Sequence, residues 1–374
     1  MYGGKSVGVV IPAYNEEGFI GRTIETVPTF VDRIYPVDDA SEDDTWTEIE
    51  QSASQLNVYP QDRNDVRRVV PIRHEYNRGV GGAIKTGYHE AVGDGMDIIA
   101  VMAGDGQMDP AVLPRMLDPI ASSEAAYAKG NRLHRRYDRE HMSRWRLFGN
   151  SLLTMLTRIS SGYWQMTDPQ NGYTAISRSA LEAVPFEQLY DRYGFANDIL
   201  VMLNGYGFRI ADVPHKALYG EEKSYIKYRT FIPNLSWLLL RRFTWRLKTK
   251  YLIRGFHPLV LSYPTGISAI VLGLVIAMYA VMSTPGGLFL SVVLSITIAL
   301  IGAMLLIMSM WFDVEDNRGL VLQITPSNEE LLKFPIDSED AFQIATNQAI
   351  SDGGRGGGPS RRVEQVSQVR ETEP

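Results

Sequence analysis

An acidic turn after an apolar run combines residue types that bind a hard divalent cation. The run Asp97–Met102 predicts a buried strand, and Ala103-Gly104-Asp105-Gly106-Gln107 follows it directly. In α/β proteins, ligands gather beyond the carboxyl ends of parallel strands. The Asp105 carboxylate and the Gln107 amide oxygen can face one ion there, and Mg²⁺ or Mn²⁺ often bridges such oxygens to a diphosphate. By itself this pattern is equally typical of a plain strand-end turn, so the metal site depends on the motifs around it.

Three further polar loops carry residue types that suit a nucleotide. The loop Ile11-Pro12-Ala13-Tyr14-Asn15-Glu16-Glu17 offers a tyrosine ring and a carboxylate that can hold a base and a ribose. Adjacent carboxylates in Asp38-Asp39-Ala40-Ser41 repel one another unless they bind donors or a cation, although a helix N-cap is an alternative use. In Asn77-Arg78-Gly79-Val80-Gly81-Gly82, glycines permit close backbone approach, and the following helix offers its positive end and the cation of Lys85.

The elements that must position these loops alternate between strand and helix. Strands are predicted over 6–12, 33–37, 69–73, 97–102, 125–130, 174–177 and 208–214, and helices over 16–27, 44–56, 82–92, 110–120, 145–160 and 198–204. This alternation predicts an α/β domain over residues 1–230, with a parallel sheet and helices on both faces.

Composition narrows the function classes. The chain has 374 residues, of which 45% are hydrophobic, enough for one large or two ordinary domains with a real core. The absence of Cys excludes disulfides, thiolate nucleophiles and Cys-based zinc sites. A net charge of −6 argues against a nucleic-acid partner.

The carboxyl-terminal third predicts a membrane anchor. Two nearly uncharged stretches, 258–282 and 287–311, are each long enough to span a bilayer, and they form the predicted hairpin 257–312. Residues 231–256 mix Trp and Leu with Arg and Lys, which predicts a juxtamembrane segment in the headgroup region, with an ordinary surface helix as the alternative. The basic cluster and the lack of a visible signal peptide predict a multi-pass protein of the cell membrane with a cytoplasmic amino-terminal domain. Residues 313–374 are expected to form a polar, partly disordered cytoplasmic tail.

In their order and spacing, the four loops resemble the GT-A fold of family 2 glycosyltransferases. The family motifs P-x-Y-N-E, V-D-D-x-S-x-D-x-T and N-x-G-x-G-x-A are matched in full, and the metal turn D-x-D-x-Q is matched except at its first position. Downstream, Gly130-Asn131-Arg132, Arg146-Leu147-Phe148-Gly149-Asn150 and Asp168-Pro169-Gln170-Asn171-Gly172-Tyr173 resemble the polyprenyl-phosphate subgroup, which includes dolichol-phosphate mannosyltransferases and their glucosyl relatives. The resemblance covers roughly residues 5–255, and a membrane hairpin also occurs in this subgroup.

The resemblance implies roles for individual residues. It places the nucleotide on Pro12, Tyr14, Glu16, Asp39 and Lys85, the metal on Asp105 and Gln107, and the lipid phosphate against Arg132 and Arg146. Asp168 either positions the sugar or serves as base for a hydroxyl acceptor, and a turn-capping role is the alternative. One departure from the family pattern stands out: Ala103 replaces the first acid of the metal turn, so the cation loses one protein contact.

The expected reaction is inverting transfer of a hexose from GDP-mannose or a UDP-sugar to dolichyl or polyprenyl phosphate on the cytoplasmic face. Such lipid-linked sugars feed protein glycosylation and cell-surface polymers alike. Mg²⁺ or Mn²⁺ is the expected cofactor, the lipid bilayer is an expected partner, and the membrane helices offer a route to a homo-oligomer.

Three other interpretations compete with this one. A processive synthase acting on a polysaccharide or lipid-linked hydroxyl would need a wider membrane domain and usually a Q-x-x-R-W motif, but Arg144-Trp145 lacks the preceding Gln. A non-catalytic membrane scaffold that binds a sugar nucleotide is supported only by Ala103. A dinucleotide-dependent oxidoreductase is disfavoured, because no G-x-G-x-x-G follows the first strand.

Overall fold

The computed structural model describes residues 1–57, 67–132, 144–215, 228–282 and 288–324. The chain divides into two compact units, Met1–Ile324 and Thr325–Pro374, and the second lies outside the described residues. The tail expected from residue 325 onward and the reversal expected at Thr284-Pro285-Gly286 are likewise outside them.

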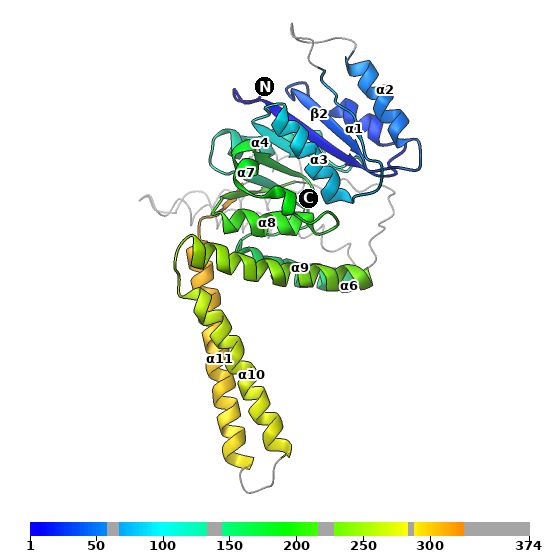
Figure 1. The fold of residues 1–374 in the computed structure, drawn as a ribbon. Coiled ribbons are helices and arrows are strands. Elements are labelled where there is room, and N and C mark those ends of the chain that lie inside the picture. The colour runs from blue at the N-terminus through cyan, green and yellow to red at the C-terminus, as the bar shows by residue number, and fades with distance from the viewer. Residues whose placement is uncertain (58–66, 133–143, 216–227, 283–287, 325–374) are drawn as a thin grey trace, which may run out of the picture. The chain divides into compact units, whose positions relative to one another are not determined.

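One eight-stranded sheet runs through the first unit, in the order β3-β2-β1-β4-β6-β5-β7-β8 (Figure 1). Its strands are β1 (Val7–Ala13), β2 (Arg33–Asp38), β3 (Ile72–Arg73), β4 (Ile98–Val101), β5 (Tyr127–Asn131), β6 (Thr174–Ser177), β7 (Ile210–Pro214) and β8 (Val321–Gln323). Only β6 pairs antiparallel with its neighbours β4 and β5, so every other strand runs in one direction. The carboxyl ends of β1, β2, β4, β5 and β7 therefore meet at one edge, as a ligand-binding α/β sheet requires. The sheet is mostly parallel as expected, and the reversed β6 is the exception.

Helices cover both faces of the sheet, which confirms the predicted layering. They are α1 (Ile20–Thr26), α2 (Thr45–Asn57), α3 (Val80–Gly93), α4 (Leu113–Ala121), α6 (Arg144–Ser161), α7 (Arg178–Ala183), α8 (Phe195–Gly205) and α9 (Tyr228–Lys248), with short helical turns at Pro110–Val112 and Phe186–Gln188. One buried cluster joins α1, α2 and α4 to the sheet through Ile24, Ile49 and Met116. A second cluster, which includes Tyr88 of α3 and Leu200 of α8, covers the opposite face.

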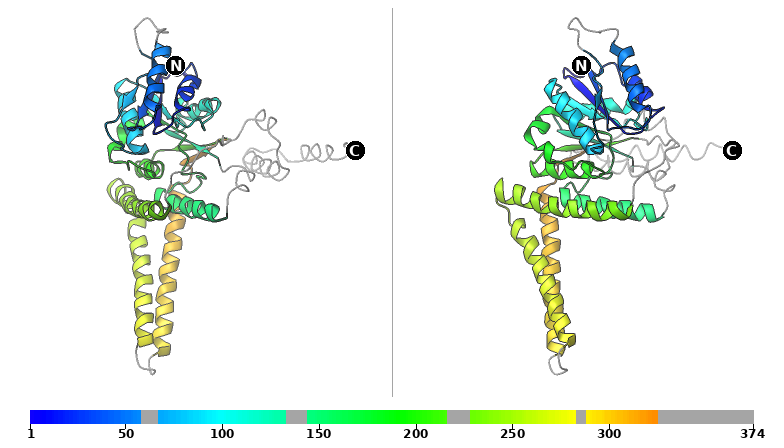
Figure 2. Two further views of the ribbon diagram at one scale, coloured as in Figure 1. Left: turned by 90° about the vertical axis from the view of Figure 1, so that its right-hand side faces the viewer. Right: turned by 45° about the vertical axis from the view of Figure 1, so that its right-hand side comes forward.

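Helices α6 and α9 form a further layer that packs beneath α8 (Figures 1 and 2). Their contact is apolar, with Leu153 of α6, Val201 of α8, and Leu235 and Leu239 of α9 buried together. The last turn of α9 continues into a π-helical turn, Thr249–Ile253.

Two long apolar helices, α10 (Leu259–Met282) and α11 (Leu288–Asp316), lie side by side (Figures 1 and 2). Their mean hydropathy is 2.2 for Leu259–Met282 and 2.7 for Phe289–Asp316, and both are long enough to cross a bilayer. Only 17% and 11% of their most apolar windows are buried, whereas the core helix of a soluble protein hides its apolar side chains. These helices therefore have the length and exposure expected of the predicted hairpin.

Helix α11 extends past the predicted end at residue 311, and the chain then returns to the sheet. Strand β8 pairs in parallel with β7, with Val321 beside Ile210. The extension is stabilised by Asp313, which forms a fully buried two-pronged ion pair with Arg246 of α9, both contacts being 2.9 Å long. Residues 313–324, expected in the tail, thus belong structurally to the first unit.

Candidate active site

The loops that follow β1, β2 and β4 contact one another at the carboxyl edge of the sheet. Asp39 donates its backbone N–H to Ala13 (2.9 Å), and Gly104 donates to Pro12 (3.2 Å). Asn15 donates to the Ser41 hydroxyl at 3.0 Å, which ties the first loop to the second. The predicted nucleotide and metal loops are thus neighbours in space as well as in motif order.

Asp39 joins the second loop to the glycine loop. Its carboxylate accepts the backbone N–H groups of Arg78 (2.8 Å) and Gly79 (2.7 Å) and contacts His74 Nδ1 at 2.7 Å. The far nitrogen of His74 contacts the hydroxyl of Thr86 at 2.9 Å. Burial tends to raise the pKa of Asp39, but His74 and the two amides hold that pKa below its ordinary value. Asp39 is therefore a fixed carboxylate that organises this edge.

The glycines of the third loop make room for the chain itself. A Cβ on Gly79 would lie 2.6 Å from the carbonyl oxygen of Asp191, and one on Gly81 would collide with that of Tyr190. Gly82 donates its N–H to the Asp191 carbonyl at 3.0 Å. The glycines were expected to let a ligand approach the backbone closely. In the structure, the backbone of residues 190–191 makes this close approach to the start of α3.

Lys85 also holds residues 187–191 against α3. Its buried ammonium donates to the carbonyls of Glu187 (3.0 Å) and Leu189 (3.1 Å) and pairs with Asp191 at 2.6 Å. These three partners account for the three donors of an ammonium group. A contact of Lys85 with the nucleotide stays a prediction that this geometry does not support.

The first loop exposes Tyr14 but not all of its side chains. Tyr14 is 43% exposed, and Pro12 is half-buried. The backbone N–H of Glu16 donates to Thr45 at 2.8 Å, which fastens this loop to the start of α2. Tyr14 is therefore accessible to a ligand.

Asp105 lies in a tight turn beyond the end of β4. Asp105 accepts the Gln107 backbone N–H at 3.0 Å, and Gly106 takes the positive φ of 71° that closes the turn. Burial raises the pKa of the Asp105 carboxyl, against the lowering effects of that amide and of the positive charge of Arg132. A cation would compensate this half-buried charge, so the donor chemistry fits Mg²⁺ or Mn²⁺. Among the described residues, no group of three or more His, Asp or Glu is placed to hold a metal.

Arg132 and Asp168 form the clearest polar pair at this edge. Arg132 directs Nε (2.9 Å) and its backbone N–H (3.2 Å) to one carboxylate oxygen of Asp168, and Nη2 to the other (3.4 Å). Asp168 is buried, and burial would raise its pKa, but the charges and hydrogen bonds of Arg132 hold that pKa below its usual value. Arg146 lies in the first turn of α6, and its side chain is outside the described part.

Two charged residues beneath this pair were missed from the sequence. Lys129 and Asp212 lie side by side in β5 and β7, and each is 1% exposed. Burial lowers the pKa of Lys129 to about 7 and raises that of Asp212 to about 6. The available signal was a charged residue inside each of two predicted buried strands, where an unpaired charge is costly.

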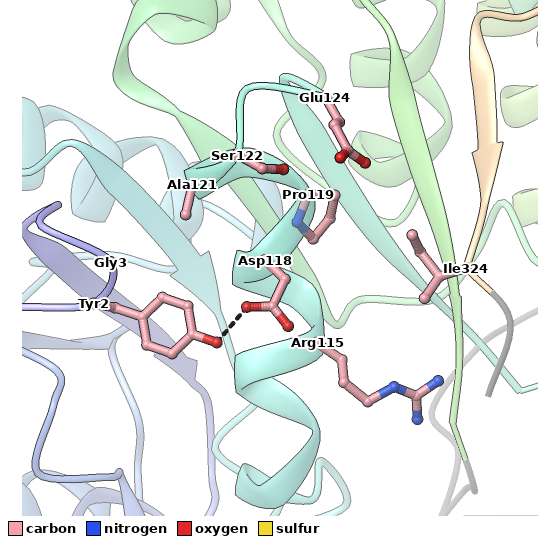
Figure 3. A pocket seen from close by; sticks show the side chains of 9 residues that line it. All are labelled: Tyr2, Gly3, Arg115, Asp118, Pro119, Ala121, Ser122, Glu124 and Ile324. Carbon is pink, nitrogen blue, oxygen red and sulfur yellow. Dashed lines mark hydrogen bonds between the residues drawn. The ribbon is translucent and has the colours of Figure 1, made fainter. Parts of the chain in front are cut away.

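A separate cavity of about 620 Å³ lies away from this edge, between the amino terminus and α4 (Figure 3). Tyr2 donates its hydroxyl to Asp118 across it, and Arg115 and Glu124 also line it. None of the predicted site residues contributes to its wall.

Comparison with known proteins identifies the family. The model of glycosyl transferase family 2 matches residues 8–184. A UDP-N-acetylglucosamine–dolichyl-phosphate N-acetylglucosaminyltransferase of Methanococcus voltae is 33% identical over 220 residues, which are 58% of this chain and 87% of the relative. An undecaprenyl-phosphate mannosyltransferase of Micrococcus luteus is 27% identical over 216 residues, 55% of this chain and 80% of the relative. Among solved structures, glucosyl-3-phosphoglycerate synthase of Mycobacterium tuberculosis shares 20% identity at a TM-score of 0.47, over 64% of this chain and 81% of that one.

These findings agree with the order of motifs in the sequence. Both named relatives carry a polyprenyl phosphate in their names, which confirms the resemblance to that subgroup. The family match and the mostly parallel sheet with flanking helices confirm the predicted GT-A fold class. The chain belongs to glycosyl transferase family 2.

Proposed function

We propose that the protein transfers a hexose from a nucleotide sugar to dolichyl or polyprenyl phosphate at the cytoplasmic face of the membrane. The names of the two relatives support the acceptor class. The observation that carries the proposal is the Arg132 guanidinium, which Asp168 holds at the sheet edge near the charge of Asp105. That arrangement offers a cation to an acceptor phosphate beside the predicted metal turn.

On the donor side, Pro12, Tyr14, Glu16 and Asp39 would surround the nucleotide. The exposed ring of Tyr14 is available to stack on a nucleotide base. Asp39 fixes the glycine loop by accepting the backbone N–H groups of Arg78 and Gly79. Asp105 and Gln107 would hold Mg²⁺ or Mn²⁺, which when bound neutralises the charge that develops on the departing diphosphate.

On the acceptor side, a phosphate needs orientation more than it needs a base. The second pKa of a phosphate monoester is about 6, so a polyprenyl phosphate is mostly dianionic at neutral pH. Arg132 would bind it through paired donors, and Arg146 would add a second cation. A phosphate oxygen then bonds to the anomeric carbon as the bond from that carbon to the diphosphate breaks. This direct displacement inverts the anomeric centre, so a retained α-linkage in the isolated product would exclude it.

A hydroxyl acceptor is the competing possibility, and Asp168 would then have to act as the base. The pKa of Asp168 lies below its usual value because Arg132 pairs with it, which makes the carboxylate a poor proton acceptor. The phosphate acceptor is therefore the better fit to this pair.

The membrane elements suit a lipid acceptor. Helix α9 exposes Ile232, Trp237 and Leu240, side chains that can enter the headgroup region. Helices α10 and α11 would anchor the chain in the bilayer. Self-association through these two helices remains a prediction of the sequence.

The test is an assay of the purified, detergent-solubilised protein with Mn²⁺ or Mg²⁺, a polyprenyl phosphate and each radiolabelled nucleotide sugar in turn. We expect one donor to move label into the organic phase. Asp105→Asn should lower kcat at least about 100-fold, because it removes the carboxylate that holds the cation. Asp44→Asn, which changes an exposed carboxylate at the start of α2, is the matched control.

The outcomes separate the competing functions. Nucleotide binding without transfer from any donor would favour the non-catalytic scaffold. Transfer that Asp105→Asn leaves intact would contradict the proposed metal turn.

A further inference from the structure

Lys129 and Asp212 are two buried ionisable residues that the proposed reaction does not itself use. They are register partners on the adjacent parallel strands β5 and β7, in strands whose every residue is buried. Two charged groups at such a depth gain little net stability over apolar residues of similar size, because both lose their hydration. Their contacts with the neighbouring segment suggest what the pair contributes.

Both residues form hydrogen bonds with the segment 167–171, on either side of Asp168. One carboxylate oxygen of Asp212 accepts the Thr167 hydroxyl (2.7 Å) and the Thr167 backbone N–H (3.2 Å). Lys129 donates its ammonium to the carbonyl of Asn171. The segment 167–171 is thus fastened near both of its ends to the buried strands.

Asp168 lies inside that fastened segment and is the residue that holds Arg132. Three hydrogen bonds fix the orientation of the Arg132 guanidinium and backbone, at 2.9, 3.2 and 3.4 Å. Any shift of residues 167–171 would therefore move the carboxylate on which Arg132 depends.

We propose that Lys129 and Asp212 are positioning residues of the acceptor site, which hold segment 167–171 so that Asp168 presents Arg132 to the acceptor phosphate. This inference rests on the proposed function, because it assumes that Arg132 binds that phosphate. Neither residue touches the substrate; they act through Thr167, Asn171 and Asp168.

The surroundings of Asp212 support this role over a purely structural one. The second carboxylate oxygen of Asp212 has no hydrogen-bond partner among the described residues. Asn131 of β5 lies 3.5 Å from the first oxygen, and Arg158 of α6 contributes a further positive charge. Such an incompletely satisfied buried group costs stability, which fits a pair retained for orientation.

The experiment measures binding of farnesyl phosphate and of a nucleoside diphosphate to the full-length protein in detergent, together with acceptor and donor KM. The variants are Lys129→Met, Asp212→Leu and the double variant that combines them. In each single variant we expect the acceptor KM and the dissociation constant for farnesyl phosphate to rise about 10- to 100-fold, the range seen when the support of a site residue is removed. The donor KM should change less than about twofold.

The double variant separates positioning from stability. Removing both charges should recover part of the thermal midpoint that the single variants lose, since neither charge is left buried without the other. Acceptor binding should nevertheless stay weak. Lys85→Met is the matched control, because it also removes a buried lysine that donates to backbone carbonyls, but to those of Glu187 and Leu189 rather than to segment 167–171. It should lower stability without a selective rise in acceptor KM.

Each failure has its own signature. If the double variant regains acceptor binding with its stability, or if the folded single variants bind farnesyl phosphate like the wild type, the inference is wrong and the proposed function stands. If the wild type binds no farnesyl phosphate and transfers sugar to no lipid phosphate, the proposed function fails and the inference with it.

Discussion

At the residue scale, the acceptor chemistry depends on the Arg132–Asp168 pair. A guanidinium on the edge of a sheet has many conformations, and ordering it costs side-chain entropy. The three hydrogen bonds to buried Asp168 already restrain the Arg132 side chain in the free protein. Its planar donors are therefore oriented before a phosphate binds.

We predict that Arg132→Ala raises the acceptor KM about 10- to 100-fold, because charge-assisted hydrogen bonds contribute about 1.5–3 kcal/mol each. Arg132→Lys should give an intermediate rise, since it keeps the charge but loses the fork. Steady-state kinetics at saturating donor is the measurement, and Arg67→Ala, at an exposed arginine, is the control. An unchanged acceptor KM in Arg132→Ala would remove this residue from the site.

The sequence is more informative about residues that end strands than about the partners of a charged residue inside a helix. Asp39, Asp105 and Arg132 each follow a strand or end one, and the structure gathers them at one edge because that edge is set by strand direction. Lys85 carries the right charge in the right motif, but its partners Glu187 and Leu189 are a hundred residues away in the chain, and no local pattern reveals them.

At the element scale, the start of α3 depends on glycines at the points where residues 190–191 pack against it. A Cβ on Gly81 would meet the backbone of Tyr190, which cannot rotate away as a side chain can. The same contact keeps Asp191 near Lys85 and Gly82. The glycines at the start of α3 therefore allow residues 190–191 to pack against this helix.

We predict that Gly81→Ala destabilises the protein by about 1–3 kcal/mol, the usual cost of overpacking. Gly93→Ala, in the same helix but with open space around the new methyl group, should be neutral or slightly stabilising. Chemical denaturation in detergent compares the two. Equal midpoints for both variants would contradict the close packing.

The junction between α9 and α11 is the second critical contact among the elements. Arg246 and Asp313 are fully buried, and the Tyr251 hydroxyl donates to the same carboxylate at 2.7 Å. No local pattern pairs Arg246 with Asp313, because one precedes the predicted membrane spans and the other follows them.

We predict that Asp313→Asn costs about 3–5 kcal/mol of stability, because it leaves the Arg246 charge buried without its counter-ion. The exposed pair Arg318–Glu315 lies just beyond and provides the control, since Glu315→Gln should cost less than about 1 kcal/mol. Thermal unfolding in detergent measures both. A similar small loss in the two variants would show that the buried pair is not required.

At the scale of the whole molecule, strand β8 brings the chain back to the sheet after α11, so residues on both sides of the hairpin belong to one compact unit. Sequence reasoning placed the boundary at residue 313, because a three-residue edge strand carries too little periodicity to be recognised. The two long apolar helices begin within a few residues of the predicted spans, since long uncharged runs are strong signals.

We predict that both ends of the hairpin face the cytoplasm, as the basic segment before α10 requires. The chain has no cysteine, so single cysteines report their side without background. In intact cells a membrane-impermeant maleimide should label Met282→Cys, which is 81% exposed at the end of α10, but should label Arg67→Cys only after lysis. The reverse pattern would invert the topology.

The central claim is that the acceptor's phosphate receives the sugar. The most direct measurement supplies wild-type protein, its metal and its donor with either a polyprenyl phosphate or the corresponding polyprenol, and follows label into lipid. We expect a labelled lipid product with the phosphate and none with the alcohol, because Arg132 binds a dianion that needs no base. Equal labelling of the alcohol would contradict the account and identify a hydroxyl as the acceptor.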